Sequence, residues 1–230
     1  MHTCLRSRAT YYHSVRQSIR EITSARFPKE GNPTLDPCSH GCAASSPSTA
    51  PLRFAALDFE TADYGRDSAC ALSLVIVEND TIADVWTTLI RPPRRDFVFT
   101  YLHGIAWEHV KNQPTFGELW GEIVQRLQGL TFVAAHNASF DRSVLHACCQ
   151  TAAVPPLESS FVCTVRAARS IWGFYPTTLA DVCRQLRIPL NHHNAESDAR
   201  ACAQILLAAR SQGHHYDQVL KTCCLRSSRR

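Results

Sequence analysis

A short apolar segment that runs into two acidic residues constrains the fold of this chain more than any other feature. Residues 54–57 (FAAL) lead into residues 58–61 (DFET), a pattern typical of a buried strand. Because successive side chains on a strand point to opposite faces, Asp58 and Glu60 share one face and Phe59 packs on the other. Two unpaired carboxylates side by side are costly to bury unless a cation such as Mg²⁺ or Mn²⁺ compensates for their charge. A strand that ends at the surface with two solvated acids is the alternative interpretation.

Three later segments bring further polar residues to the ends of apolar stretches. Residues 133–141 (VAAHNASFD) run from a buried-strand pattern into Asp141, and residues 193–198 (HNAESD) end in Asp198. Residues 101–105 (YLHGI) form a weaker motif. Together with the first segment, these stretches supply four carboxylates and a histidine, a set suited to binding divalent ions and moving a proton.

In this order, the motifs LDFET, HNASFD and His-x4-Asp resemble the DEDD superfamily of 3′–5′ exonucleases, which includes the proofreading exonuclease subunit of bacterial DNA polymerase III. The branches of the superfamily differ in the last motif. One branch has Tyr four residues before its final Asp, where this chain has Asn194; the other has His five residues before it, where this chain has His193. The chain therefore resembles the histidine branch, over residues 52–210.

The resemblance implies hydrolysis of phosphodiester bonds with two divalent ions, Mg²⁺ or Mn²⁺, as cofactors. Asp58 is expected to bridge both ions, with Glu60 and Asp198 holding the first. Asp141 is expected to hold the second ion, in part through water. His193 is expected to act as the general base that takes a proton from the attacking water, since imidazole titrates near neutral pH.

The spacing of the last motif adds a structural constraint. Five residues along an α-helix rotate by roughly 500°, which leaves two side chains about 140° apart in projection. His193 and Asp198 therefore cannot share a helical face, and we predict that His193 lies on a loop ahead of a helix that carries Asp198. His192 is a neighbouring candidate that the spacing disfavours, and simple exposure is the alternative interpretation of this polar segment.

Three further residues are expected from the resemblance to contact the terminal nucleotide of the substrate. Thr61 follows the acid pair, where the superfamily uses backbone groups for this purpose. His103 matches a superfamily loop beside that nucleotide, with a turn histidine as the alternative. Asn137 either contacts a phosphate or caps the helix that follows it.

The hydrophobic periodicity predicts an α/β domain. Turn signals and apolar segments indicate three antiparallel strands at residues 53–60, 70–78 and 81–90, joined in part by a two-residue turn at residues 79–80. The other expected elements are strands at 130–135 and 161–163 and helices at 115–128, 139–150, 164–172, 178–187 and 195–210. We predict a mixed five-stranded sheet with helices on both faces, which agrees with the ribonuclease-H-like architecture that the resemblance implies.

Composition divides the chain into three parts. We predict a disordered or weakly structured appendage at residues 1–51, an exonuclease domain at residues 52–212 and a basic tail at residues 213–230. The net charge is +4 up to residue 53, −4 from there to residue 220, and +4 beyond it. The basic ends either add salt-sensitive affinity for nucleic acid or serve as solvated tails.

The cysteines and the absence of targeting patterns indicate in which cellular compartment the protein is expected. The 11 cysteines are scattered and odd in number, which indicates reduced thiols. No apolar run approaches the ~18 residues of a membrane span, and no signal-peptide pattern is present. We therefore expect a soluble cytoplasmic protein without a membrane partner, although the Arg- and Ser-containing start of the chain leaves an organelle transit peptide open. A zinc site at residues 38–42 is disfavoured because no second ligand pair follows at finger spacing.

These observations favour a metal-dependent 3′–5′ exonuclease that releases nucleoside 5′-monophosphates from DNA, single-stranded or with a frayed 3′ end. An exoribonuclease is the main alternative, because oligoribonuclease and ribonuclease T share the same motifs and the shape of the pocket decides tolerance of the 2′-hydroxyl. A non-catalytic nucleic-acid-binding module and a small-nucleotide phosphodiesterase are the others. Association with a polymerase stays open, and the short basic end favours a nuclease that acts alone.

Overall fold

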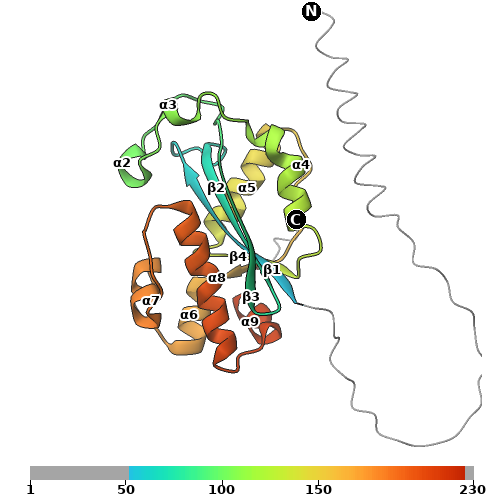
Figure 1. Cartoon of the computed structure of the whole chain (residues 1–230), viewed down its shortest axis with the longest axis vertical. Coiled ribbons are helices and arrows are strands. Elements are labelled where there is room, and N and C mark those ends of the chain that lie inside the picture. The colour runs from blue at the N-terminus through green and yellow to red at the C-terminus, as the bar shows by residue number, and fades with distance from the viewer. Residues whose placement is uncertain (1–51, 226–230) are drawn as a thin grey trace, which may run out of the picture. The chain divides into compact units, whose positions relative to one another are not determined.

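The structure, a computed structural model, describes residues 52–225 (Figure 1). The appendage predicted at residues 1–51 lies outside the described residues, as does the end of the predicted basic tail. Within the described range, every helix is too short or too polar to cross a membrane.

Five strands form one mixed sheet, as the sequence predicts, and they lie in the order β3-β2-β1-β4-β5. The strands are β1 (Arg53–Thr61), β2 (Ala69–Glu78), β3 (Thr81–Leu89), β4 (Phe132–Ala135) and β5 (Phe161–Cys163). The pairs β1–β2 and β2–β3 are antiparallel, whereas β1–β4 and β4–β5 are parallel. The predicted turn at Asn79 and Asp80 joins β2 to β3, with both residues at positive φ. Because β4 pairs with β1 only as far as Ala56, the end of β1 extends beyond its parallel neighbour.

Helices cover both faces of this sheet, and the alternation of side chains along β1 decides what each face holds. The helices are α2 (Thr100–His103), α3 (Trp107–Val110), α4 (Phe116–Leu127), α5 (Ser139–Thr151), α6 (Thr164–Trp172), α7 (Leu179–Leu186), α8 (Ala195–Ser211) and α9 (Tyr216–Cys223). Leu57 and Phe59 pack with α4 and α5 on one face. Phe54 and Ala56 pack with α6 to α9 on the other, where α8 lies along the sheet (Figure 1). Asp58 continues this second set, on the face under α8.

The domain extends beyond the boundary at residue 212 that we predicted from charge. The segment expected to be a tail contains α9, whose Val219 and Cys223 are buried. Beyond the helix, the N–H of Leu225 donates a hydrogen bond to the carbonyl of Phe161 in β5 over 2.7 Å. Tyr216, Val219 and Cys223 recur at intervals of three and four residues, so α9 has an apolar face that the count of basic residues concealed.

We predict that α9 contributes substantially to stability. The ring of Tyr216 lies 5.5 Å from that of Phe54 and 5.9 Å from that of Phe132, and its hydroxyl donates to Asp80 over 2.9 Å. Tyr216→Ala should lower the free energy of unfolding by about 3 to 5 kcal/mol, as for other buried aromatic side chains cut to alanine. Urea denaturation followed by circular dichroism measures this, with the exposed Gln218→Ala as the control. Equal midpoints for both variants would contradict the packing of α9.

Candidate active site

Four carboxylates meet at the end of β1, and they are the four acids that the sequence analysis proposed as metal ligands. Asp58 and Glu60 lie on β1 itself, two residues apart and therefore on the same face. Asp141 lies in the first turn of α5, and Asp198 lies in the first turn of α8. The backbone N–H of Phe59 donates to Oδ1 of Asp141 over 3.3 Å, which ties α5 to the strand between the two acids.

Crowding and burial make these acids hard to ionise together. Burial raises the pKa of Asp58 well above its usual range, and the charges of the other three acids add to the effect. Asp58 keeps part of its surface open to solvent, so the crowded protein around it, rather than complete enclosure, desolvates it. Burial, followed by the charges of Asp198 and Asp141, raises the pKa of Glu60 to about 7. Burial also raises the pKa of Asp141, although its hydrogen bond from Phe59 and the charge of Arg66 oppose the change.

The two carboxylate oxygens of Asp198 have different surroundings. Oδ2 accepts a hydrogen bond from Nδ1 of His192 over 2.8 Å and another from the backbone N–H of His193 over 3.1 Å. Oδ1 is buried and has no hydrogen-bond partner. A buried carboxylate oxygen without a partner is unfavourable unless a cation binds to it. The charge of Asp198 also acts on Asp58 and Glu60, so its side chain lies within the acid cluster.

These residues fit a divalent cation by the chemistry of their donors. Carboxylate oxygens are the ligands that Mg²⁺ and Mn²⁺ prefer, and a bound cation reverses the repulsion that raises the carboxylate pKa values. Within residues 52–225, no group of three or more His, Cys, Asp or Glu side chains is already arranged so that it could hold a metal ion. The buried, unpartnered Oδ1 of Asp198 is the atom that most directly suits the ion.

His193 lies on the loop ahead of α8, as its spacing from Asp198 predicts. Its backbone has a positive φ of 65°, and its ring stacks on that of His192 with centroids 4.0 Å apart. The side chain that contacts Asp198 is that of His192, the candidate that the spacing disfavoured, whereas His193 contacts Asp198 through its backbone. Spacing identifies the loop but not which ring turns toward the carboxylate.

Sequence analysis assigned no role to His136, which the structure shows to be a half-buried residue that connects three segments. One ring nitrogen, Nδ1, is 2.8 Å from Oγ1 of Thr164, and Nε2 is 3.0 Å from the carbonyl of Thr177. Since a carbonyl only accepts, Nε2 carries the proton and Nδ1 accepts from the hydroxyl. Burial lowers the pKa of His136 to about 4, and the nearby His192 contributes to this. His136 therefore stays neutral and joins the end of β4 to α6 and to the segment before α7. The sequence signal that could have identified this residue is its place in the HNASFD motif.

The residues predicted to contact the terminal nucleotide have clear structural surroundings. Nε2 of His103 donates to the carbonyl of Thr61 over 3.1 Å, and Nδ1 accepts from the N–H of Ile105 over 3.0 Å. Burial lowers the pKa of His103, consistent with this neutral form. Asn137 is exposed at a positive φ of 61°, and its Oδ1 accepts from the hydroxyl of Ser139 over 3.2 Å. The structure thus joins His103 to Thr61. Asn137 meets the start of α5 through the hydroxyl of Ser139 and through its own carbonyl, which accepts from the N–H of Phe140 over 2.8 Å.

An exposed apolar group, missed by the sequence analysis, borders the segment that follows β1. Of the five large hydrophobic residues exposed among residues 52–225, four belong to it: Tyr64, Val98, Tyr101 and Leu102. Tyr64 and Tyr101 are 80% and 77% exposed. The ring of Tyr64 meets that of Phe99 edge-on at 4.9 Å, and the N–H groups of Val98 and Phe99 both donate to the carbonyl of Ala62. These bonds hold two separate loops together next to Thr61.

One salt bridge keeps the first of these loops in shape. The guanidinium of Arg94 donates two hydrogen bonds to the carboxylate of Asp63 and two to that of Asp67, over 2.6 to 3.1 Å. The guanidinium lowers the pKa of Asp67. Desolvation alone would raise the pKa of Asp63, but the bonds from Arg94, Gly65 and Ser68 together lower it. Gly65 sits inside the bridge, where an added Cβ would lie 2.3 Å from Arg94.

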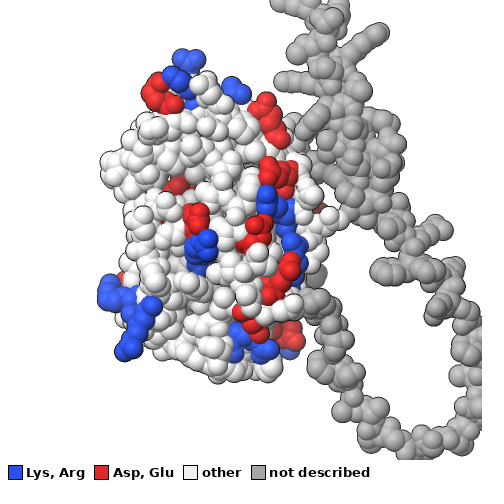
Figure 2. Space-filling view, viewed as in Figure 1, with Lys and Arg blue, Asp and Glu red and all other residues white. Residues whose placement is uncertain are grey.

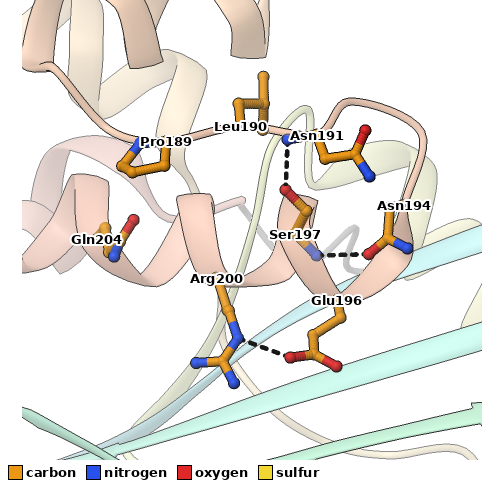
Figure 3. Close-up of a pocket in the computed structure, with 8 residues that line it drawn as sticks. All are labelled: Pro189, Leu190, Asn191, Asn194, Glu196, Ser197, Arg200 and Gln204. Carbon is orange, nitrogen blue, oxygen red and sulfur yellow. Dashed lines mark hydrogen bonds and ion pairs between the residues drawn. The ribbon is translucent and has the colours of Figure 1, made fainter.

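A hollow of about 500 Å³ lies between α8 and the segment that precedes it (Figure 3). Its lining contains none of the four acids and consists of Pro189, Leu190, Asn191, Asn194, Glu196, Ser197, Arg200 and Gln204. The hydroxyl of Ser197 accepts from the N–H of Asn191 over 2.8 Å, and the N–H of Ser197 donates to the side chain of Asn194 over 3.0 Å. These two bonds attach the loop that carries His192 and His193 to the first turn of α8.

Comparisons with known proteins agree with this geometry. The family model described as "Exonuclease" matches residues 55–206. The PolC-type DNA polymerase III of Thermotoga petrophila is 30% identical over 158 residues, which cover 67% of this chain. The 3′-5′ exonuclease DinG of Bacillus subtilis is 28% identical over 161 residues, again 67% of this chain. The chain spans only 12% and 17% of the length of these two relatives.

Among solved structures, the nuclease domain of 3′hExo, a DEDDh family member bound to rAMP, is similar in fold. Its TM-score is 0.64 at 15% sequence identity, and the alignment covers 77% of this chain and 98% of that one. At this identity the likeness concerns the architecture, and it confirms the predicted ribonuclease-H-like sheet.

We predict that the acid cluster makes the metal-free protein less stable as the pH rises. Folded Glu60 keeps its proton up to about pH 7, whereas an unfolded glutamate loses it near ~4.3. Between these values the folded state binds more protons, so the free energy of unfolding falls with rising pH. In EDTA, the midpoint of thermal unfolding should therefore fall from about pH 5 to about pH 8. Mn²⁺ added at the higher pH should raise it again, because only the folded state gathers the ligands.

The control for this prediction is Glu60→Gln, which removes one titrating carboxylate and one ligand. Its midpoint should depend less on pH in EDTA and respond less to Mn²⁺ than that of the unaltered chain. An equal response of both proteins to Mn²⁺ would show that the ion binds elsewhere.

Proposed function

The chain belongs to the exonuclease family, and on that premise we propose that it is a metal-dependent 3′–5′ exonuclease that releases nucleoside 5′-monophosphates from nucleic acid. The observation that carries the proposal is the meeting of four carboxylates, one with a buried and unpartnered oxygen, at the end of β1. Fold alone would not support an activity, since one fold serves many functions. Here the site and the family point to the same chemistry.

Asp58, Glu60, Asp141 and Asp198 are the residues that would hold two Mg²⁺ or Mn²⁺ ions. Such ions neutralise charge on the scissile phosphate and activate the attacking water. The carboxylates define where the phosphate binds, and their strand and helix positions keep them rigid. His193 takes the proton from the attacking water; its loop is fixed to α8 by the bonds of Ser197, and its own N–H is fixed to Asp198.

The exposed apolar group supports a substrate whose 3′ end is single-stranded or frayed. Aromatic faces stack on unpaired bases without preference for sequence, and Tyr64 and Tyr101 present such faces to solvent. Tyr64 follows Thr61 closely in the chain, and Tyr101 precedes His103 by two residues. We propose that Thr61 and His103, which are joined by a hydrogen bond, contact the terminal nucleotide. On the face seen in Figure 2, basic and acidic residues are interspersed without a continuous basic strip, so stacking and metal contacts supply most of the affinity there.

DNA is the proposed polymer, because the relatives with the higher identity are a DNA polymerase III and the exonuclease DinG. RNA is the alternative, because the similar nuclease domain of 3′hExo binds rAMP. We propose a nuclease that acts without a polymerase subunit. The relatives' additional length, which this chain does not span, leaves partners to experiment.

The exonuclease is tested with the full chain and 5′-labelled single-stranded DNA and RNA in Mg²⁺, Mn²⁺ or EDTA. A ladder that shortens from the 3′ end only with metal is expected, and the faster polymer identifies the substrate. Asp58→Asn should lower the rate at least roughly 100-fold, because the site loses a carboxylate ligand for the ions that neutralise the charge of the transition state. Asp58→Asn purified in the same way is the control for a contaminating nuclease, and the exposed Gln218→Ala, away from the acid cluster, should keep full activity.

Two other results would replace the proposal. If the chain binds the DNA or the RNA but cleaves neither with Mg²⁺ or Mn²⁺, it is a non-catalytic nucleic-acid-binding module. Cleavage of dinucleotides but not of longer strands would identify a small-nucleotide phosphodiesterase.

The general base has a test of its own. His193→Gln keeps a polar side chain of similar reach but cannot take up a proton near neutral pH. It should lower kcat roughly 100- to 10,000-fold and remove the limb of the pH–rate profile that reports the base. A profile that keeps both its shape and its height would exclude His193 from proton transfer.

A further inference from the structure

Two donors bind one oxygen of Asp198 and none binds the other. The Nδ1 of His192 and the backbone N–H of His193 both donate to Oδ2, over 2.8 and 3.1 Å. Oδ1 is buried without a partner, and the side chain as a whole is only 6% exposed. If this carboxylate rotated, the oxygen that accepts two hydrogen bonds would change places with the oxygen that accepts none. The arrangement therefore selects which oxygen faces the acid cluster.

We infer that His192 is a positioning residue, which orients Asp198 so that Oδ1 is presented to the divalent ion. This inference rests on the proposed function, since it assigns a role at the same site. Hydrogen bonds to a ligating carboxylate fix its orientation, and their loss typically weakens metal binding 10- to 100-fold. His192 acts through Asp198 and does not itself contact the reacting atoms.

The ring of His192 also stacks on the ring of His193. The two rings are stacked with centroids 4.0 Å apart and an angle of 17° between their planes. His193 has a left-handed backbone, at a φ of 65°, which bends the loop so that one residue uses its ring and the next its N–H on the same oxygen. His192 thus links the proposed base to a proposed metal ligand.

The loop does not depend on His192 for its conformation. Asn194 caps α8 through the N–H of Ser197, and Ser197 binds the N–H of Asn191, as Figure 3 shows. The side chain of His192 is 42% exposed. Substitutions at this position should therefore leave the fold intact, which makes the role testable. An exposed loop histidine that touches Asp198 without consequence is the competing explanation.

Asparagine separates a positioning role from proton transfer. Its Nδ2 is attached to Cγ as Nδ1 is in histidine, so His192→Asn can donate to the same oxygen but has no titrating ring. His192→Phe keeps an aromatic ring to stack on His193 but has no donor. His192→Ala lacks both features.

The experiment measures Mn²⁺ binding to the full chain by calorimetry, together with the metal dependence of the exonuclease rate. His192→Ala and His192→Phe should bind Mn²⁺ 10- to 100-fold more weakly, and His192→Asn should bind it nearly as the unaltered chain does. At saturating Mn²⁺, all three should recover most of kcat, whereas His193→Gln should not. Circular dichroism checks that each variant is folded.

Three outcomes would overturn the inference. His192→Ala and His192→Phe with unchanged Mn²⁺ affinity would show that the bond to Asp198 has no consequence. Equal weakening in His192→Asn and His192→Ala would show that the donor is not what matters. Unchanged Mn²⁺ affinity with a loss of kcat that asparagine does not restore would make His192 the base instead.

The failure of the proposed function gives a different result. In that case the unaltered chain itself neither binds Mn²⁺ nor shortens a strand, whatever stands at position 192. An unaltered chain that does both, with variants that match it, contradicts the positioning role alone.

Discussion

The repulsion among four carboxylates at the end of β1 is the constraint on which the rest of this structure depends. Burial and neighbouring charge both raise the pKa of Asp58, and Glu60 reaches a pKa of about 7 for the same reasons. The fold tolerates this cost because rigid elements approach the site from three directions, β1 at its centre and the first turns of α5 and α8 around it. A cation converts the unfavourable cluster into a binding site, so the same charges that weaken the metal-free protein give it an affinity for metal.

The loop ahead of α8 shows how a short segment can place several functional groups at once. Asn194 begins the helix, His193 turns the chain through a left-handed conformation, and His192 reaches back to Asp198. Each residue makes a different kind of contact, and together they leave a single oxygen of Asp198 without a partner. The exposed apolar group next to Thr61 is held by its own bonds. The four acids lie on β1, α5 and α8, so the proposed base-stacking surface and the acid cluster are built on different elements of one domain.

Much of the architecture could be predicted because its local signals are strong. The alternation along β1 separates Phe59 from the acids, and the capping pair Thr115 and Glu118 marks the start of α4. The prediction of a tail at residues 213–230 was wrong, because the basic residues there were easier to see than the apolar face of a short helix. Basic residues near the C-terminal end suggested a tail, although the apolar face of α9 was present in the same segment. The exposed group around Tyr64 and Tyr101 carries no local signal, since its residues become neighbours only when two loops meet.

The sequence by itself determined that the chain forms a mixed five-stranded sheet, in which order its helices and strands follow one another, and to which family it belongs. It also singled out the four acids that meet at the end of β1, because all of these depend on residue type and on spacing along the chain. Only the tertiary structure decided that His192 rather than His193 donates its ring to Asp198, that Oδ1 is the oxygen left free, and that His136 is a neutral connector. Spacing sets which residues share a loop, whereas the direction of a ring depends on backbone φ and on packing against neighbours distant in the chain. For that reason the family could be predicted from the sequence, whereas the arrangement of the loop ahead of α8 could not.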